Sequence, residues 1–308
     1  TLNPSSAASD VYKRQIGASP VAHKSFIKDR DINAEFLNRT DCYLPKATSL
    51  RVSKLGYYSE EQEQKFINFN SLKDYLEIIK YYINVPNKRF KEIEIELANP
   101  KQINNGTIQM ESELYNHIRP KGEFTTNERQ YNQLKKGGIK YLELRSIDLN
   151  PYTAYGISQI EIEFLELLSI YCILCGNEKI DPIEEIKIKE NIRRASESGQ
   201  DCNLICSFEK GDAEKNIKVL TQELLESLES LSNEIGLKDN HKNMFKEFYR
   251  RNEVPLSTQI IDDLSNNSIV NFISSKSKKQ NLNISKKFLK KMSLEAKKSK
   301  KEYLDQQN

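Results

Sequence analysis

The sequence predicts an α+β protein, because its hydrophobic period changes along the chain. Between Phe90 and Asn150 the apolar residues recur at every second position, as in "IEIEL", "TIQMESELY" and "IKYLELRS". On both sides of this stretch they recur at helical spacing, three and four residues apart. This pattern indicates a sheet with one face packed on helices and the other face open to a cleft.

Length and composition define the broad class of the protein. At 308 residues the chain can bury a core, and one or two domains are expected. Its formal net charge of +3 is close to balanced, and 37% of its residues are apolar. We find no apolar run long enough to cross a bilayer and no secretory signal pattern. The sequence therefore predicts a globular protein in the cytoplasm, without a membrane partner.

The chain divides into four parts by pattern. Residues 1–15 are small and polar, with no clear period, and we expect a leader that is disordered or unrelated to the fold. The sheet-containing part, residues 16–151, includes the helix "NSLKDYLEIIKYYI", which begins after a cap at Asn70 or Ser71. Residues 152–275 are predicted to be a helical layer that supports the sheet. Residues 276–308 are predicted to be a lysine-rich terminal helix or tail.

Two features outside the sheet have alternative interpretations. The tail from Lys276 carries eleven lysines and three acids, which would suit a nucleic-acid arm. Because the tail has no arginine and its lysines fall on the solvent-exposed face of a predicted helix, we expect a solvated helix and no nucleic-acid partner. Cys172 and Cys175, with Cys202 and Cys206, could offer four thiolates to zinc. The surrounding "IEFLELLSIYCILC" favours a buried amphipathic helix with reduced thiols.

A glutamate and an arginine lie two positions apart in the strand-like segment "YLELRS". At this spacing both side chains point to one face of a strand, with α-carbons about 6.6 Å apart. Mg²⁺ prefers carboxylate and phosphate oxygens, and arginine grips phosphate oxygens with a planar fork. Glu143 could therefore hold a metal while Arg145 reaches the phosphate bound to it. A solvent-exposed ion pair across a sheet is the alternative that spacing alone leaves open.

Three segments in order, "LPKATSLRVSKLGY", "ESELYNHIRPK" and "GGIKYLELRSIDLNPYTAYGIS", closely resemble the bacterial glutamate–cysteine ligases, or γ-glutamylcysteine synthetases. The likeness runs from about Ile16 and weakens after about Asp181. It implies part of a glutamine synthetase-like antiparallel sheet cup with a helical carboxy-terminal layer. It also implies the joining of L-glutamate to L-cysteine through a γ-glutamyl phosphate, the first step of glutathione synthesis. The resemblance further implies ATP as co-substrate, Mg²⁺ as cofactor, and a monomer when the protein is full length.

The same resemblance assigns roles to single residues. Glu143 matches the family's magnesium-binding glutamate, and Arg145 matches an arginine that contacts the transferred phosphate. Residues that hold the cysteine substrate are matched by Arg51, Tyr57 and Tyr115. Weaker candidates for metal, phosphate or nucleotide charge are Glu113, Arg119 and Lys121. No metal-site pattern is matched by the three histidines, His23, His117 and His241.

The match begins inside the family's sequence. Full-length members have a large amino-terminal part before the position of Ile16, and it holds most of the acidic metal ligands. The resemblance therefore implies that this chain is an incomplete fragment, inactive by itself. For function, the alternative is another carboxylate–amine ligase of the same superfamily with a different amine acceptor.

Overall fold

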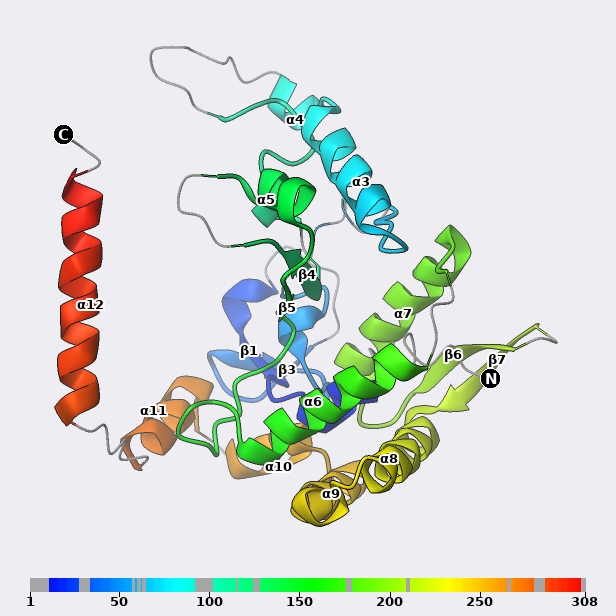
Figure 1. Cartoon of the computed structure of the whole chain (residues 1–308). Coiled ribbons are helices and arrows are strands. Elements are labelled where there is room, and N and C mark those ends of the chain that lie inside the picture. The colour runs from blue at the N-terminus through cyan, green and yellow to red at the C-terminus, as the bar shows by residue number, and fades with distance from the viewer. Residues whose placement is uncertain are drawn as a thin grey trace.

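The fold is α+β, as the sequence predicts, with helices and three small antiparallel sheets (Figure 1). The computed structural model describes residues 11–27, 34–56, 59, 62, 65–91, 102–114, 116–123, 128–175, 179–208, 211–264, 267–279 and 286–305. In these residues we find no helix whose length and apolar character would let it cross a bilayer.

The amino-terminal part contains a three-stranded sheet. Its strands are β1 (Val21–His23), β2 (Glu35–Phe36) and β3 (Asp41–Tyr43), which pair in the order β1-β3-β2. The 3-10 helices η1 (Lys24–Phe26) and η2 (Leu50–Val52) follow β1 and β3. Residues 11–16 are helical and mostly buried, so the described end of the expected leader is ordered. Its unrelatedness to the fold stays a prediction.

Helix α3 (Leu72–Asn84) confirms the helix expected after Asn70 or Ser71. The cap is Ser71, whose hydroxyl accepts a hydrogen bond from the backbone N–H of Asp74 at 3.0 Å. On the buried face of α3, Tyr75 and Ile79 pack against Leu114, together with Ile108, Tyr82 and Leu134. The short helices α4 (Lys88–Lys91) and α5 (Gln130–Gly137) complete this part.

The strands expected between Phe90 and Asn150 form only in part. "IKYLELRS" does form a strand, β5 (Tyr141–Leu144), whereas "IEIEL" lies outside the described residues. The prediction of a strand in "TIQMESELY" is wrong, because residues 107–110 are irregular and are followed by the 3-10 helix η3 (Glu111–Glu113). A carboxylate oxygen of Glu113 accepts a hydrogen bond from Gln109 N at 2.7 Å, and this local bond closes a turn.

Strand β5 pairs with a strand that the sequence pattern does not predict, β4 (Ile118–Lys121). Pro120 inside β4 argues against a strand in the sequence, but proline is tolerated at the edge of a sheet. The two strands form a separate two-stranded antiparallel sheet.

The carboxy-terminal half is wrongly predicted to be helical throughout. A hairpin of β6 (Asn203–Phe208) and β7 (Gly211–Asn216) interrupts it, with Leu204 and Cys206 buried in the core. Gly211 has a φ of +112°, a conformation that side chains other than hydrogen disfavour. Within the described residues no group of three or more histidine, cysteine or acidic side chains is placed to hold a metal, so the four cysteines do not assemble as a zinc site.

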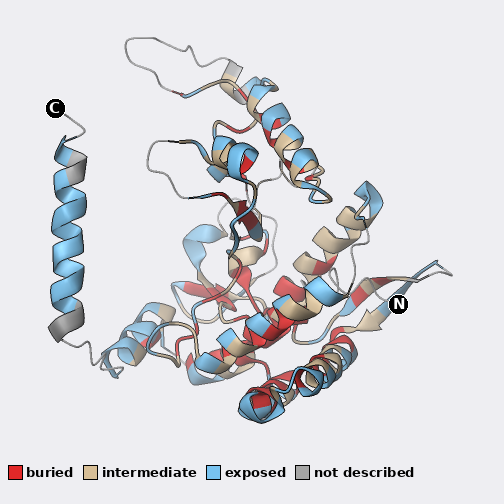
Figure 2. Cartoon of the chain, in the orientation of Figure 1, coloured by how far each residue is buried: buried red, intermediate tan, exposed pale blue. Residues whose placement is uncertain are grey.

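The helices of this half are α6 (Gln159–Leu174), α7 (Pro182–Ser198), α8 (Ile217–Glu234), α9 (Lys238–Glu253) and α10 (Leu256–Leu264). Three of them, α6, α8 and α9, form the largest core cluster of the described residues, together with Ile16. In the core, the rings of Phe164 on α6 and Phe248 on α9 stack with centroids 4.2 Å apart. Figure 2 shows the buried residues gathered where these helices meet the small sheets.

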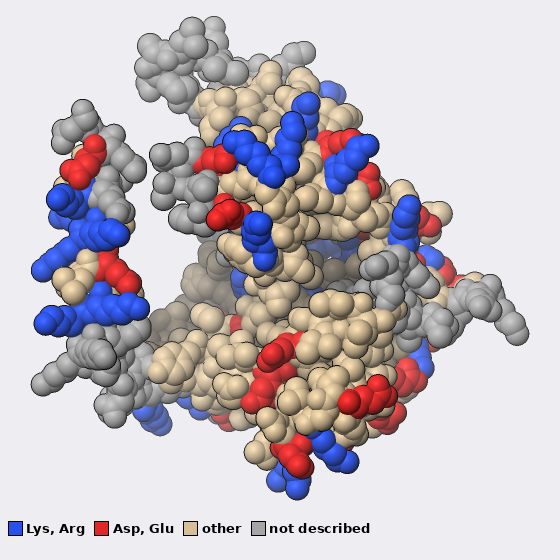
Figure 3. Space-filling model, in the orientation of Figure 1, with Lys and Arg blue, Asp and Glu red and all other residues tan. Residues whose placement is uncertain are grey.

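Two further helices end the described chain. The predicted boundary at residue 276 falls inside α11 (Ile269–Lys279), whose Phe272 is buried against Val21 of β1. Helix α12 (Lys286–Asp305) stands apart from the body in Figure 1, and its lysines are prominent in Figure 3. Every side chain of α12 whose burial is described is exposed.

Candidate active site

The β4–β5 hairpin places Glu143 on the face of the sheet that carries charge. Helix α5 is followed by Gly138, whose positive φ of +69° turns the chain toward β5. In the antiparallel register Glu143 lies opposite Arg119, while Leu142 lies opposite Pro120. Because alternate residues point to opposite faces, the charged residues share one face and the apolar residues share the other.

Two cations of β4 lie on the same face as Glu143, and among the described residues Lys121 forms an ion pair with it. Lys121 Nζ lies 3.2 Å from Glu143 Oε2 and also donates to the side-chain oxygen of Gln130 at 3.0 Å. Arg119 is buried and donates from Nη2 to the carbonyl oxygens of Ser112, at 2.7 Å, and Leu114. Arg119 therefore ties the preceding turn to β4, and the lysine is the cation that faces the carboxylate.

Arg145 follows β5 on the same face as Glu143. Its backbone N–H donates to the carbonyl oxygen of His117 at 2.8 Å, which continues the pairing beyond the two strands. The side chain is half-buried, and in the described part of the chain it makes no hydrogen bond or ion pair. A guanidinium that the protein does not neutralise is suited to an anionic ligand.

Arg51 reaches the chain segment that follows Arg145. It donates from Nη1 to Ile147 O at 3.1 Å, and the same nitrogen lies 3.9 Å from Asp148 Oδ1. Asp148 is buried, and its second oxygen accepts a hydrogen bond from Ala18 N at 2.9 Å. The structure thus brings Arg51 close to β5, as a common site would require.

His117 lies at the start of β4 and is not singled out by the sequence. Burial, followed by the charges of Lys13 and Arg51, lowers the pKa of His117 to about 3. The imidazole is therefore neutral at pH 7 and adds no positive charge to those of Lys13 and Arg51. The two remaining sequence-predicted site residues, Tyr57 and Tyr115, lie outside the described residues.

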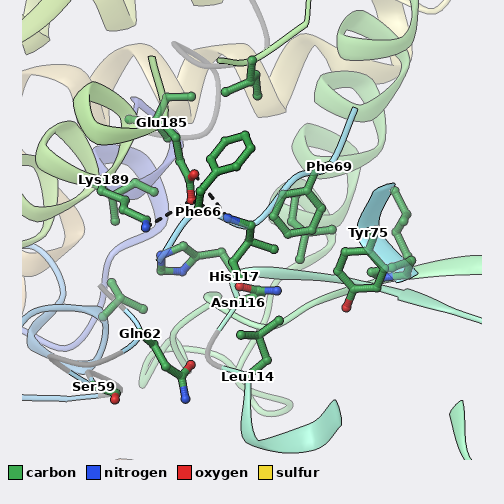
Figure 4. A pocket seen from close by; sticks show the side chains of 18 of the residues that line it. Ser59, Gln62, Phe66, Phe69, Tyr75, Leu114, Asn116, His117, Glu185 and Lys189 are labelled. Atoms are coloured by element: carbon green, nitrogen blue, oxygen red, sulfur yellow. Dashed lines mark hydrogen bonds and ion pairs between the residues drawn. The ribbon is translucent and has the colours of Figure 1, made fainter. Parts of the chain in front are cut away.

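A cavity of about 490 Å³ lies behind the hairpin, between its apolar face, α3 and α7. Ile118 and Leu142 line it from the hairpin, and Tyr75 lines it from α3. Figure 4 shows His117 and the Glu185–Lys189 ion pair, whose atoms lie 3.1 Å apart, on one side of this cavity. Phe69 and Tyr75 lie on its other side. The sequence does not reveal this cavity, since its walls come from segments far apart in the chain.

An α+β protein in which a carboxylate and an arginine share one strand face has the groups that bind a metal–phosphate ligand. Comparison with known proteins is consistent with this class of site. A family model described as "Glutamate-cysteine ligase" matches residues 11–195, and the chain belongs to this family.

Individual relatives agree with the family model. A glutamate–cysteine ligase of Wigglesworthia glossinidia brevipalpis is 34% identical over 286 residues, which are 89% of this chain and 56% of that protein. One from Shewanella halifaxensis is 39% identical over 181 residues, covering 58% of this chain and 35% of that protein. The chain thus spans about half, or less, of the length of these curated relatives.

The fold is also similar to that of a solved family member. A crystal structure of glutamate–cysteine ligase from Francisella tularensis in complex with AMP superposes with a TM-score of 0.84. The superposition covers 96% of this chain and 62% of that chain, at 22% sequence identity. This likeness extends to the fold of nearly the whole chain described here.

Proposed function

We propose that this chain carries part of the active site of a glutamate–cysteine ligase, which joins the γ-carboxylate of L-glutamate to the amine of L-cysteine at the expense of ATP. The observation that carries the proposal is the placement of Glu143 and Arg145 on one strand face in a chain that belongs to this family. We place β4 and β5 in a glutamine synthetase-like antiparallel cup and the enzyme in the cytoplasm.

In this proposal ATP phosphorylates the γ-carboxylate, and the cysteine amine then displaces phosphate from the acyl phosphate. Such a reaction depends on positioning and on neutralising the phosphoryl oxygens. Arg145 is assigned to these oxygens because the described chain leaves its guanidinium without a partner. Arg51, Tyr57 and Tyr115 are assigned to the cysteine substrate, and Arg51 is held beside β5 by Ile147 and Asp148.

Glu143 is assigned to Mg²⁺. Its carboxylate is a hard oxygen donor on a side chain that is 40% exposed, and its ion-pair partner among the described residues is Lys121. Mg²⁺ commonly takes one or two carboxylates and completes its shell with phosphate oxygens and water, so Glu143 fits as one ligand. When bound, the ion would neutralise phosphate charge. Lys121, 3.2 Å from Glu143, balances the charge of the carboxylate.

We also propose that the 308 residues do not make an active enzyme alone. One carboxylate does not complete a magnesium shell, and the chain spans 56% of the length of its Wigglesworthia relative. Further ligands and part of the substrate pocket would come from the remaining length.

The test is ADP release in a completed enzyme, made by joining this chain to the part of that relative that it does not match. ADP release should require both glutamate and cysteine, and Glu143→Gln and Arg145→Ala should each abolish it while the far-UV circular dichroism is unchanged. The matched controls are Glu77→Gln and Lys246→Ala, at exposed positions on α3 and α9 away from the charged face of β4 and β5, and they should keep full activity. Release that proceeds with another amine but not with cysteine would reject the assignment of the acceptor.

A further inference from the structure

A buried carboxylate lies in the segment that follows β5. At Ser146, Asp148 and Asn150 every second side chain is polar and buried, whereas Leu149 is 78% exposed. This reverses the usual placement, in which apolar side chains are buried and polar side chains face water. Because an ionised carboxylate is costly to bury unless it is paired, the burial of Asp148 calls for partners.

Asp148 joins three segments that are far apart in the sequence. Its Oδ2 accepts a hydrogen bond from the backbone N–H of Ala18, ahead of β1, at 2.9 Å. Its Oδ1 lies 3.9 Å from Nη1 of Arg51 in η2, and this oxygen accepts no hydrogen bond in the described part of the chain. The same Nη1 donates to Ile147 O at 3.1 Å. Two neighbouring residues after β5 therefore hold Arg51 against this segment.

The two contacts of Asp148 need different properties of its side chain. A hydrogen bond from a backbone N–H needs only an acceptor oxygen, which asparagine also offers. The negative charge attracts a cation, and among the described residues the ion-pair partner of Asp148 is Arg51. Since the Asp148 side chain is 2% exposed, solvent screens this attraction weakly. The Arg51 side chain is 35% exposed, so a ligand can reach it from the other side.

We propose that Asp148 is a positioning residue, which holds the Arg51 guanidinium in the orientation that receives the carboxylate of the amine acceptor. Arginine binds a carboxylate through a planar fork, so the direction of that plane decides the affinity. Ile147 O and Asp148 both face Nη1 and fix one corner of the fork. The acceptor that fits is an amine with a carboxylate, as in an amino acid. This role rests on the proposed function, which assigns Arg51 to the cysteine substrate.

The test compares cysteine with cysteamine, which has the same amine and thiol but no carboxylate. ADP release by the completed enzyme is measured with each acceptor, for the original chain and for Asp148→Asn. This variant keeps an oxygen for Ala18 N and removes the charge. It should raise the KM for cysteine about tenfold and change kcat less than about twofold, because the orientation of Arg51 is lost and the reacting groups are not. The KM for cysteamine should stay the same.

Two controls separate positioning from a general effect on the fold. Asp41→Asn changes another buried aspartate that accepts a hydrogen bond from a backbone N–H, that of Ile269 at 2.8 Å, and it should leave both KM values unchanged. In the Arg51→Ala background, Asp148→Asn should change the KM for cysteine less than about twofold, since the residue through which Asp148 acts is gone. A residue that only stabilises the fold would change the KM for both acceptors alike.

Urea unfolding of the 308-residue chain measures the link between the two side chains without catalysis. Asp148→Asn should lower the urea concentration at the midpoint, and it should lower it less, or raise it, in the Arg51→Ala background, where the buried carboxylate has lost its cation. Equal shifts in both backgrounds, or equal rises in the KM for cysteine and cysteamine, would overturn the proposal. A completed enzyme that releases no ADP with any acceptor would reject the proposed function instead, and the unfolding series would still decide whether Asp148 holds Arg51.

Discussion

The buried ion pair between Glu161 and Arg251 should be costly to break by removing one partner. Their charged atoms lie 2.8 Å apart, and each side chain is 4% exposed. Glu161 also accepts hydrogen bonds from Asn150 Nδ2 at 2.8 Å and from Ser158 N at 2.7 Å. The pair therefore connects α6 and α9 with the loop that follows β5.

Replacing Glu161 with glutamine leaves the Arg251 charge buried without its main partner. Removing one member of a buried pair costs about 3–5 kcal/mol of the free energy of unfolding. We expect about 3 kcal/mol, the lower end, because Arg251 keeps its second ion pair to Glu247 at 2.9 Å. Urea unfolding followed by circular dichroism at pH 7 measures the change, with an unaltered denaturant slope indicating an intact fold.

The matched control is Glu77→Gln, which removes the exposed Lys73–Glu77 pair, with charged atoms 4.0 Å apart. Exposed pairs contribute about 0–1 kcal/mol, so this variant should remain close to the original chain. A loss below about 1 kcal/mol for Glu161→Gln would refute the reasoning that burial makes this pair costly to break.

Three further predictions follow from burial and charge. Lys13→Met should raise the free energy of unfolding by about 1–3 kcal/mol, since Lys13 Nζ is buried without a hydrogen-bond partner among the described residues. As a control, Lys54→Met at an exposed position should change the free energy of unfolding little. The free energy of unfolding should fall as the pH drops from about 6.5 toward 3. In this range His117 binds a proton in the unfolded chain, whereas the folded imidazole, with its pKa lowered to about 3, does not. Urea unfolding at a series of pH values should therefore show a flatter pH dependence for His117→Gln. Deletion of residues 280–308 should leave the melting temperature unchanged, since the described side chains of α12 are exposed, and a drop in melting temperature would reveal packing that this reasoning lacks.

Periodicity predicts the parts of the fold in which burial is one-sided. It finds α3 with its Ser71 cap and its buried face. It also finds β5 with Glu143 facing away from Leu142, although Leu142 is exposed in the described chain. It fails where local hydrogen bonds decide the conformation, as when Glu113 closes a turn in "TIQMESELY". It also misses β6–β7, because the short alternation around Leu204 and Cys206 lies between strongly helical segments.

The sequence predicts only those residues of the candidate site that lie close together along the chain. Glu143 and Arg145 are neighbours in the sequence, and the family motifs give them roles. Lys121 is only a weaker candidate in the sequence, and its ion pair with Glu143 follows from the pairing of β4 with β5. His117, Asp148 and the cavity depend on contacts between segments far apart in the chain, which no local pattern encodes.

The most direct test of the central claim is the rate of ADP release by the completed enzyme, compared between the original chain and Glu143→Gln. We predict release that requires glutamate and cysteine together and that disappears in the variant, while the variant unfolds at the same urea concentration. Release that persists at the original rate in Glu143→Gln would contradict the assignment of β5 as the metal–phosphate strand of a glutamate–cysteine ligase.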